Sequence, residues 1–186
     1  MFVRVGEADN KLYLDLCDKA WRAVEIDGDG WRVIDKPPVR FRRSSGMTPL
    51  PEPERGGSIT DLRKFLNVKS DADFVMVVSW LLAAFRNRGP YPVLVLTGEQ
   101  GSAKSTLSAI LRSLIYPNVA PLRSLPREIR DLFIAANNGH ALVFDNYQAC
   151  RTGFLTHCAD LRPAGLLQSA KIIQTRTRCC LTPCDP

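Results

Sequence analysis

The sequence is poor in histidine and, over most of its length, in cysteine. It has 186 residues with two histidines and six cysteines, and Cys17 is the one cysteine before residue 150. This pattern argues against a disulfide framework and fits a compartment where thiols stay reduced. A zinc site in the tail is a less favoured alternative, because only Cys180 and Cys184 approach the paired spacing that structural zinc needs. Its candidate ligands are Cys150, His157, Cys158, Cys179, Cys180 and Cys184.

Long apolar runs are also missing. The longest, residues 74–85, has about twelve residues, whereas a transmembrane helix needs about 20. Residues 1–6 lack the charged start and following apolar run of a secretory signal. We expect a cytoplasmic protein with no membrane partner.

Acidic residues are scarce near the C-terminus, with no Glu after Glu128. The chain carries 25 Lys and Arg against 19 Asp and Glu, a formal net charge of +6. Residues 150–186 hold five of these basic residues and two of the acidic ones, which is half of the excess. Such mild basicity is compatible with a nucleic-acid partner but does not demonstrate one.

What the sequence does contain is a phosphate-binding pattern. Residues 94–106 read LVLTGEQGSAKST, in which an apolar strand over 91–96 runs into a small-residue loop and then a helix over 104–115. Such a loop curls so that successive backbone N–H groups face an anion at the helix N-terminus. The predicted nucleotide-binding residues are Gly98, Glu99, Gln100, Gly101, Ser102, Ala103, Lys104, Ser105 and Thr106.

Two of these side chains predict the chemistry. We expect Lys104 to reach the β- and γ-phosphates of ATP, and the Ser105 hydroxyl to coordinate Mg²⁺. Ala103 stands where the pattern G-x-x-x-x-G-K-[ST] has its second Gly. The methyl group is tolerable if this residue has a negative φ. Glu99 either orients water or is simply solvated, and we favour the second.

A second half of the site is predicted at the end of the apolar strand 140–146. Asp145 follows this strand and is expected to help hold Mg²⁺, through a metal-bound water or the Ser105 hydroxyl. Asn146 occupies the place where many ATPases have a water-orienting Glu, so binding is better assured than fast hydrolysis. The predicted catalytic residues are thus Lys104, Asp145 and Asn146, and the predicted Mg²⁺ ligands are Ser105 and Asp145.

Four regions follow from the patterning. Residues 1–50 predict a small antiparallel β subdomain, with turns at 8–10 and 27–30. Residues 51–90 form a linker and a helical segment, whose longer helix over 72–88 is expected to be buried almost all round. Residues 91–149 alternate strands and helices, which predicts an α/β fold: a P-loop NTPase parallel sheet with flanking helices, incomplete at the C-terminus. Residues 150–186 are expected to be a disordered tail.

The N-terminal region leaves one alternative open. Its tryptophans and arginines are typical of a surface that binds nucleic acid by stacking and charge. The favoured interpretation is that the tryptophans belong to a core and the arginines to a solvated face. The residues concerned are Trp21, Trp31, Arg40, Arg42 and Arg43.

Together these motifs resemble the ATPase region of phage- and plasmid-type bacterial replication proteins, which often lies downstream of a primase-like module. The resemblance covers about residues 11–147. It rests on four segments: GEQGSAKST at 98–106, PNVAPLRSLPR at 117–127, DLFIAANN at 131–138 and VFDN at 143–146. It implies a helicase-like P-loop ATPase that works on single-stranded or duplex DNA as a homo-oligomer. Arg123, Arg127 and Arg130 are then candidates for arginine fingers, although a charged helix face explains the last two equally well.

After Tyr147 the resemblance is expected to fail. Plausible codons for residues 150–162, read two bases later, spell the Pro-Asp-Trp-Leu-Ser-Asp-Ala-Leu-Cys-Arg helix with which such proteins continue. We therefore hypothesise a frameshift after about residue 147, which makes the last 37 residues an out-of-frame, non-homologous peptide. The expected function is a Mg²⁺-dependent ATPase fragment of a mobile-element replication protein. The alternative is a non-catalytic truncated remnant that binds nucleotide or DNA only, and a small-molecule kinase is disfavoured.

Overall fold

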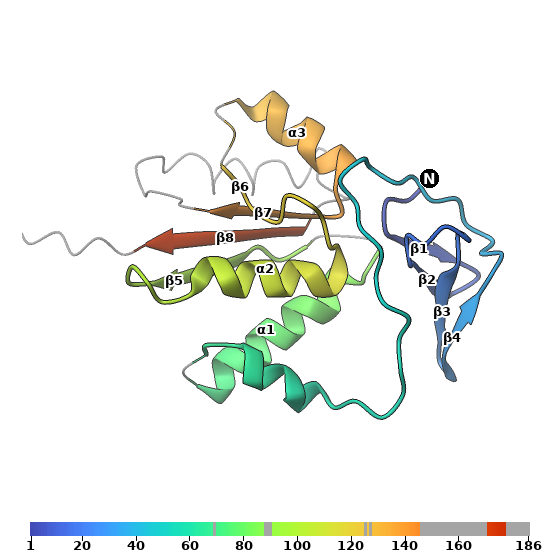
Figure 1. Cartoon of the computed structure of the whole chain (residues 1–186), viewed down its shortest axis with the longest axis horizontal. Helices are drawn as coiled ribbons and strands as arrows, with labels where there is room; N and C mark the ends of the chain where they lie inside the picture. The colour runs from blue at the N-terminus through green and yellow to red at the C-terminus, as the bar shows by residue number, and fades with distance from the viewer. Residues whose placement is uncertain (69, 88–90, 125, 127, 146–170, 178–186) are drawn as a thin grey trace, which may run out of the picture.

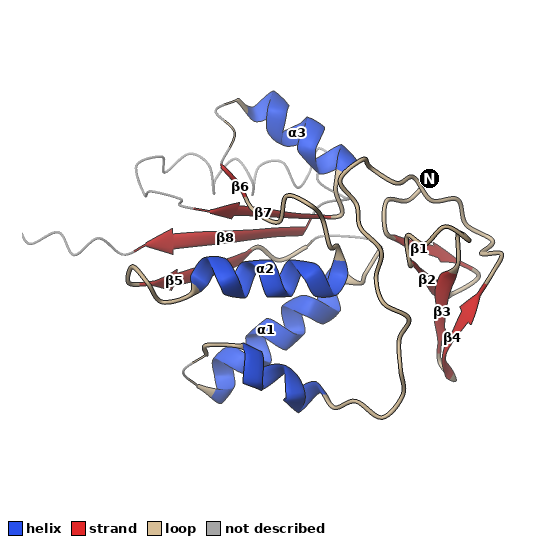
Figure 2. Cartoon of the chain, in the orientation of Figure 1, coloured by secondary structure: helices blue, strands red, loops and turns tan. Residues whose placement is uncertain are grey.

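The computed structural model describes residues 1–68, 70–87, 91–124, 126, 128–145 and 171–177. These residues form two sheets and a set of helices (Figures 1 and 2). The antiparallel sheet lies beyond the N-terminal ends of the parallel strands, so the two sheets occupy opposite ends of the molecule. The elements are β1 (Val5–Ala8), β2 (Lys11–Asp15), β3 (Ala23–Asp27), β4 (Gly30–Ile34), η1 (Ile59–Phe65), α1 (Asp71–Ala84), β5 (Leu94–Gly98), α2 (Lys104–Ile115), β6 (Arg123–Ser124), α3 (Ile129–Asn138), β7 (Ala141–Asp145) and β8 (Lys171–Thr177).

The N-terminal sheet is an antiparallel meander in the order β1-β2-β3-β4. Asp9 and Asn10, with φ of 50° and 59°, form a two-residue turn between β1 and β2. Positive φ at both central positions matches the twist of a hairpin, which is why Asp and Asn are favoured there. The predicted meander is confirmed, except that the expected strand near residues 39–42 is only a bridge between Phe2 and Phe41.

The helical segment begins where the sequence places its caps. Ser58 and Ser70 cap η1 and α1, and each forms a reciprocal capping box, with Asp61 and Asp73 respectively. The expectation that the second helix is buried almost all round is wrong. Only one face of α1 is buried, and the other exposes Val75, Met76 and Leu82.

The parallel sheet has the order β5-β8-β7-β6. Helices α1 and α2 pack with β7 in one apolar cluster, which includes Trp80 of α1, Leu111 of α2 and Val143 of β7. Strand β6 has only two residues. Trp80 also donates its indole N–H to the Pro92 carbonyl at 3.0 Å, which fixes the approach to β5.

The predicted fold class, an extended P-loop NTPase sheet left incomplete at residue 145, is therefore wrong. The described residues contain two small four-stranded sheets and no extended parallel sheet. Strand β7 is not at the edge of the sheet, because it pairs with β6 on one side and with β8 on the other. The pairing was not predictable from local sequence, because β8 comes from the segment 150–186 that was expected to be disordered. The candidate zinc ligands of the tail lie outside the described residues.

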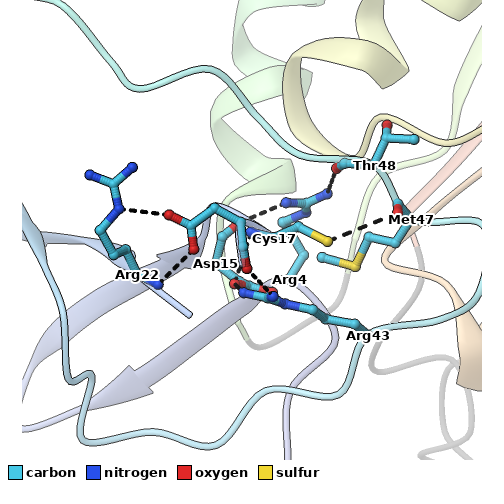
Figure 3. A network of polar contacts seen from close by, with 8 residues as sticks. Arg4, Asp15, Cys17, Arg22, Arg43, Met47 and Thr48 are labelled. Carbon is cyan, nitrogen blue, oxygen red and sulfur yellow. Dashed lines mark hydrogen bonds and ion pairs between the residues drawn. The ribbon is translucent and has the colours of Figure 1, made fainter. Parts of the chain in front are cut away.

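A polar network holds the N-terminal sheet to the chain that follows it (Figure 3). The Asp15 carboxylate is fully buried and accepts from Arg43 at 2.6 and 2.9 Å. The buried Arg4 guanidinium donates to the Asp15 and Thr48 carbonyls at 2.6 and 3.0 Å. These bonds satisfy polar groups that burial would otherwise make costly.

Trp21 does not belong to a core, contrary to the favoured interpretation. It is 50% exposed, and the Arg43 guanidinium lies 3.8 Å from its ring centroid. Trp31 is partly buried, with Arg55 at 4.8 Å from its ring. Each of these two tryptophans therefore has an arginine over its ring.

This pair of stacked arginines gives a matched test. Arg43→Ala should lower the free energy of unfolding by about 3 kcal/mol, because it leaves the Asp15 carboxylate buried without its cation. Arg55→Ala removes an exposed arginine and should cost less than about 1 kcal/mol. Urea unfolding of both variants measures the difference. Equal losses would contradict a structural role for the Asp15 pair.

Candidate functional site

Helix α2 points its first residues at the C-terminal ends of β5 and β7. Its apolar stripe, Leu107, Leu111 and Ile115, is buried against the core. This spacing of four residues lies on one helix face, so burial of the stripe fixes the rotation of the helix. The loop between β5 and α2 therefore lies at the end of the sheet, as Figure 1 shows.

The loop 99–103 is tight. A side chain at Gly98 would bring its Cβ within 2.7 Å of the Ser102 Oγ, so only glycine fits without a shift. Gly101 has φ of 80°, which glycine adopts freely. Ala103 has φ of 58°, so the negative φ under which its methyl group is readily tolerated is not adopted. The left-handed conformation explains why the pattern usually has Gly here.

Lys104 lies over the loop. Its ammonium donates to the Ser102 Oγ at 3.0 Å and to the Glu99 carbonyl, which also accepts from the Ser102 hydroxyl at 2.8 Å. The side chain is therefore directed back across the loop rather than away from it. An ammonium has three donor hydrogens and four rotatable bonds behind it, so it can turn from these oxygens to a phosphate.

Ser105 and Asp145 are in direct contact. The Ser105 hydroxyl lies 3.0 and 2.9 Å from the two carboxylate oxygens of Asp145. The two predicted Mg²⁺ ligands, 40 positions apart in sequence, thus meet at the junction of α2 and β7. A hydroxyl and a carboxylate are hard oxygen ligands of the kind that Mg²⁺ prefers. These two oxygen ligands fit a Mg²⁺–triphosphate. Binding of that complex by Ser105 and Asp145 stays a prediction.

The other predicted site residues are more loosely placed. Glu99, Gln100 and Thr106 are exposed, and Glu99 is solvated as favoured. Arg123 and Arg130 are also exposed, whereas Asn146 and Arg127 lie outside the described residues. Among the described residues, no group of three His, Cys, Asp or Glu side chains could hold a metal ion.

Two neighbours of the loop could not be predicted from the sequence. Asn67, just after η1, lies with its amide nitrogen 3.5 Å from the Ser102 carbonyl. Strand β8 places its backbone beside β5, with Thr177 in register with Gly98. Both approach the loop from distant segments, and only the three-dimensional structure brings them there.

Comparison with known proteins identifies a family for this chain. A profile of the actinomycete integrative conjugative element replication protein family matches residues 59–159. The chain belongs to this family. No curated protein and no solved structure matches the chain.

The family confirms the mobile-element replication context that the motifs indicated. Its match covers the helical segment, the loop 98–105 and Asp145. It starts later than the expected resemblance, leaving residues 1–58 outside, and it continues past Tyr147, where the resemblance was expected to end. Within the described part of the chain, no helix has the length and apolar character to cross a membrane.

The positive φ of Ala103 has a measurable consequence. Ala103→Gly should raise the free energy of unfolding by up to about 1 kcal/mol, because relief of the left-handed strain exceeds the entropy that glycine adds to the unfolded chain. Gly101→Ala should lower it by about 1 kcal/mol, since φ is positive there too and the left-handed strain outweighs the entropy that alanine removes from the unfolded chain. Chemical denaturation measures both. A loss of stability in Ala103→Gly would contradict the assigned loop conformation.

Proposed function

We propose that the loop 98–105 and Asp145 bind ATP as its Mg²⁺ complex, and that this site serves the replication of a mobile DNA element. The contact between Ser105 and Asp145 carries the proposal. It brings a hydroxyl from the N-terminus of α2 and a carboxylate from the end of β7 together, and these two groups would hold Mg²⁺.

The roles of the residues follow from their chemistry. Backbone N–H groups of the loop and the N-terminus of α2 favour an anion. Lys104 turns from the Glu99 carbonyl to the phosphate oxygens and neutralises their charge. Ser105 coordinates Mg²⁺, and Asp145 accepts a hydrogen bond from a metal-bound water. Mg²⁺ supplies charge neutralisation at the phosphates when bound.

The wider function rests on the family. A replication protein of an integrative element acts on DNA, so we propose DNA as a partner and a homo-oligomer as the working form. Arg123 and Arg130 are exposed, so their side chains are accessible to a neighbouring copy of the chain. The hypothesised frameshift after about residue 147 is disfavoured by the family match, which continues to residue 159, and by the pairing of β8 with β5 and β7.

Lys104→Ala should weaken ATP binding at least about 100-fold, because it removes charge-assisted hydrogen bonds to phosphate. Ser105→Ala should still bind ATP in EDTA. Mg²⁺ should raise the ATP affinity of the unchanged protein but not that of this variant. Isothermal titration with ATP measures both effects. Lys64→Ala is the matched control, since it removes an exposed lysine of η1. Unchanged ATP affinity in Lys104→Ala would refute the site.

The second candidate, binding without turnover, is favoured by Asn146, which can hold a water but cannot accept its proton. Phosphate release with and without single-stranded DNA separates the candidates. An ATPase should hydrolyse ATP, faster with DNA, and should lose this activity in Asp145→Asn. ATP binding with no hydrolysis in either condition would reject the ATPase and leave a nucleotide-binding remnant.

A further inference from the structure

A second polar pocket lies at the other end of α2. It has a volume of about 480 Å³ and opens between the segment 44–46, the C-terminal half of α2 and helix α3. The side chains that matter here are Ser44, Arg112, Tyr116, Asn118, Arg123 and Asp131. Its size lies within the range of small-molecule sites. The pocket is separate from the loop 98–105, because Arg112 lies eight positions, about 12 Å, along α2 from Lys104.

Arg112 is the unusual member of this pocket. It is 1% exposed, and its Nη1 donates to the Ala120 and Pro121 carbonyls at 2.6 and 2.7 Å. Its Nε is buried and has no hydrogen-bond partner among the described residues. No carboxylate of the described chain forms an ion pair with it. A buried cation without a counter-charge is costly, so an anion in the pocket would be stabilised.

The surroundings add positive charge and donors. Burial, followed by the nearby Arg123 charge, lowers the pKa of Arg112 to about 10, so Arg112 stays charged at neutral pH. Tyr116 lies with its ring centroid 5.6 Å from the Arg112 guanidinium, and its hydroxyl is 2.7 Å from the Ser44 Oγ. Asn118 contributes an amide to the wall. Asp131 is the one carboxylate that lines the described pocket, and it opposes an anion.

We propose that this pocket binds a phosphate group, carried either by a nucleic-acid strand or by a free nucleotide. Two arginines from different elements, an amide and a hydroxyl offer more donors than a carboxylate has oxygens, which favours a phosphate. This site does not depend on the nucleotide site at the loop 98–105.

The test uses the full chain with Lys104→Ala, so that the loop 98–105 does not contribute. Isothermal titration with orthophosphate should detect saturable binding. Arg123→Gln should weaken it about tenfold, the equivalent of one charged hydrogen bond of about 1.4 kcal/mol, and Asp131→Asn should tighten it. Both changes leave the carbonyl bonds of Arg112 intact. Arg86→Gln, an exposed arginine just after α1 and outside the pocket lining, is the matched control and should bind phosphate unchanged.

A labelled single-stranded oligonucleotide and a mononucleotide then identify the source of the phosphate. If the strand is the ligand, oligonucleotide anisotropy is lost in Arg123→Gln and competed by orthophosphate. If the nucleotide is the ligand, only mononucleotide binding responds to Arg123→Gln. Either result supports the pocket. No orthophosphate binding, or binding that Arg123→Gln and Asp131→Asn leave unchanged, would overturn it. Failure of ATP binding at Lys104 bears only on the first site.

Discussion

The burial of one face of α2 is the constraint on which both ends of the molecule depend. Leu107, Leu111 and Ile115 enter the core shared with α1 and β7, and this fixes the rotation and depth of the helix. Because side chains three or four residues apart share a helix face, Ser105 lies on the same face as the buried Ser108 and Arg112. The same rotation also buries Arg112 one turn before the helix ends. Packing therefore positions polar groups at both ends without a dedicated contact for each.

Much of this arrangement could be predicted from local sequence. The bounds of α2 follow from a loop of small residues before Lys104 and from Tyr116-Pro117 after Ile115, and the structure agrees with both. The serine caps of η1 and α1 were visible because a capping box needs only four residues. The closeness of Ser105 and Asp145 was also predictable, since the strand ends of a parallel sheet and the following helix N-termini meet at one edge.

Two of the wrong predictions share one physical origin, which is contact between residues that are distant in sequence. An apolar pattern shows that α1 is rich in Val, Met and Leu, but not that only one of its faces is covered, so the helix was wrongly expected to be buried almost all round. Strand β8 pairs between β5 and β7 although about 25 residues separate it from β7, and such register carries no local signal. The conformation of Ala103 was missed for another reason. A glycine at this position would have indicated a positive φ, whereas an alanine does not.

The N-terminal region and the region that the family profile matches are joined by charged groups as well as by apolar contacts. Tyr116, inside the region that the family profile matches, lies between the guanidinium groups of Arg4 and Arg112, at 5.4 and 5.6 Å from its ring. Its hydroxyl meets Ser44, and Met47 forms a bridge with Asn118. Replacement of such polar groups by apolar ones is often neutral or stabilising, so stability alone does not account for two buried arginines at one junction. Directional bonds instead fix how the segment 44–48 lies against α2, and this geometry keeps the wall of the second pocket in place.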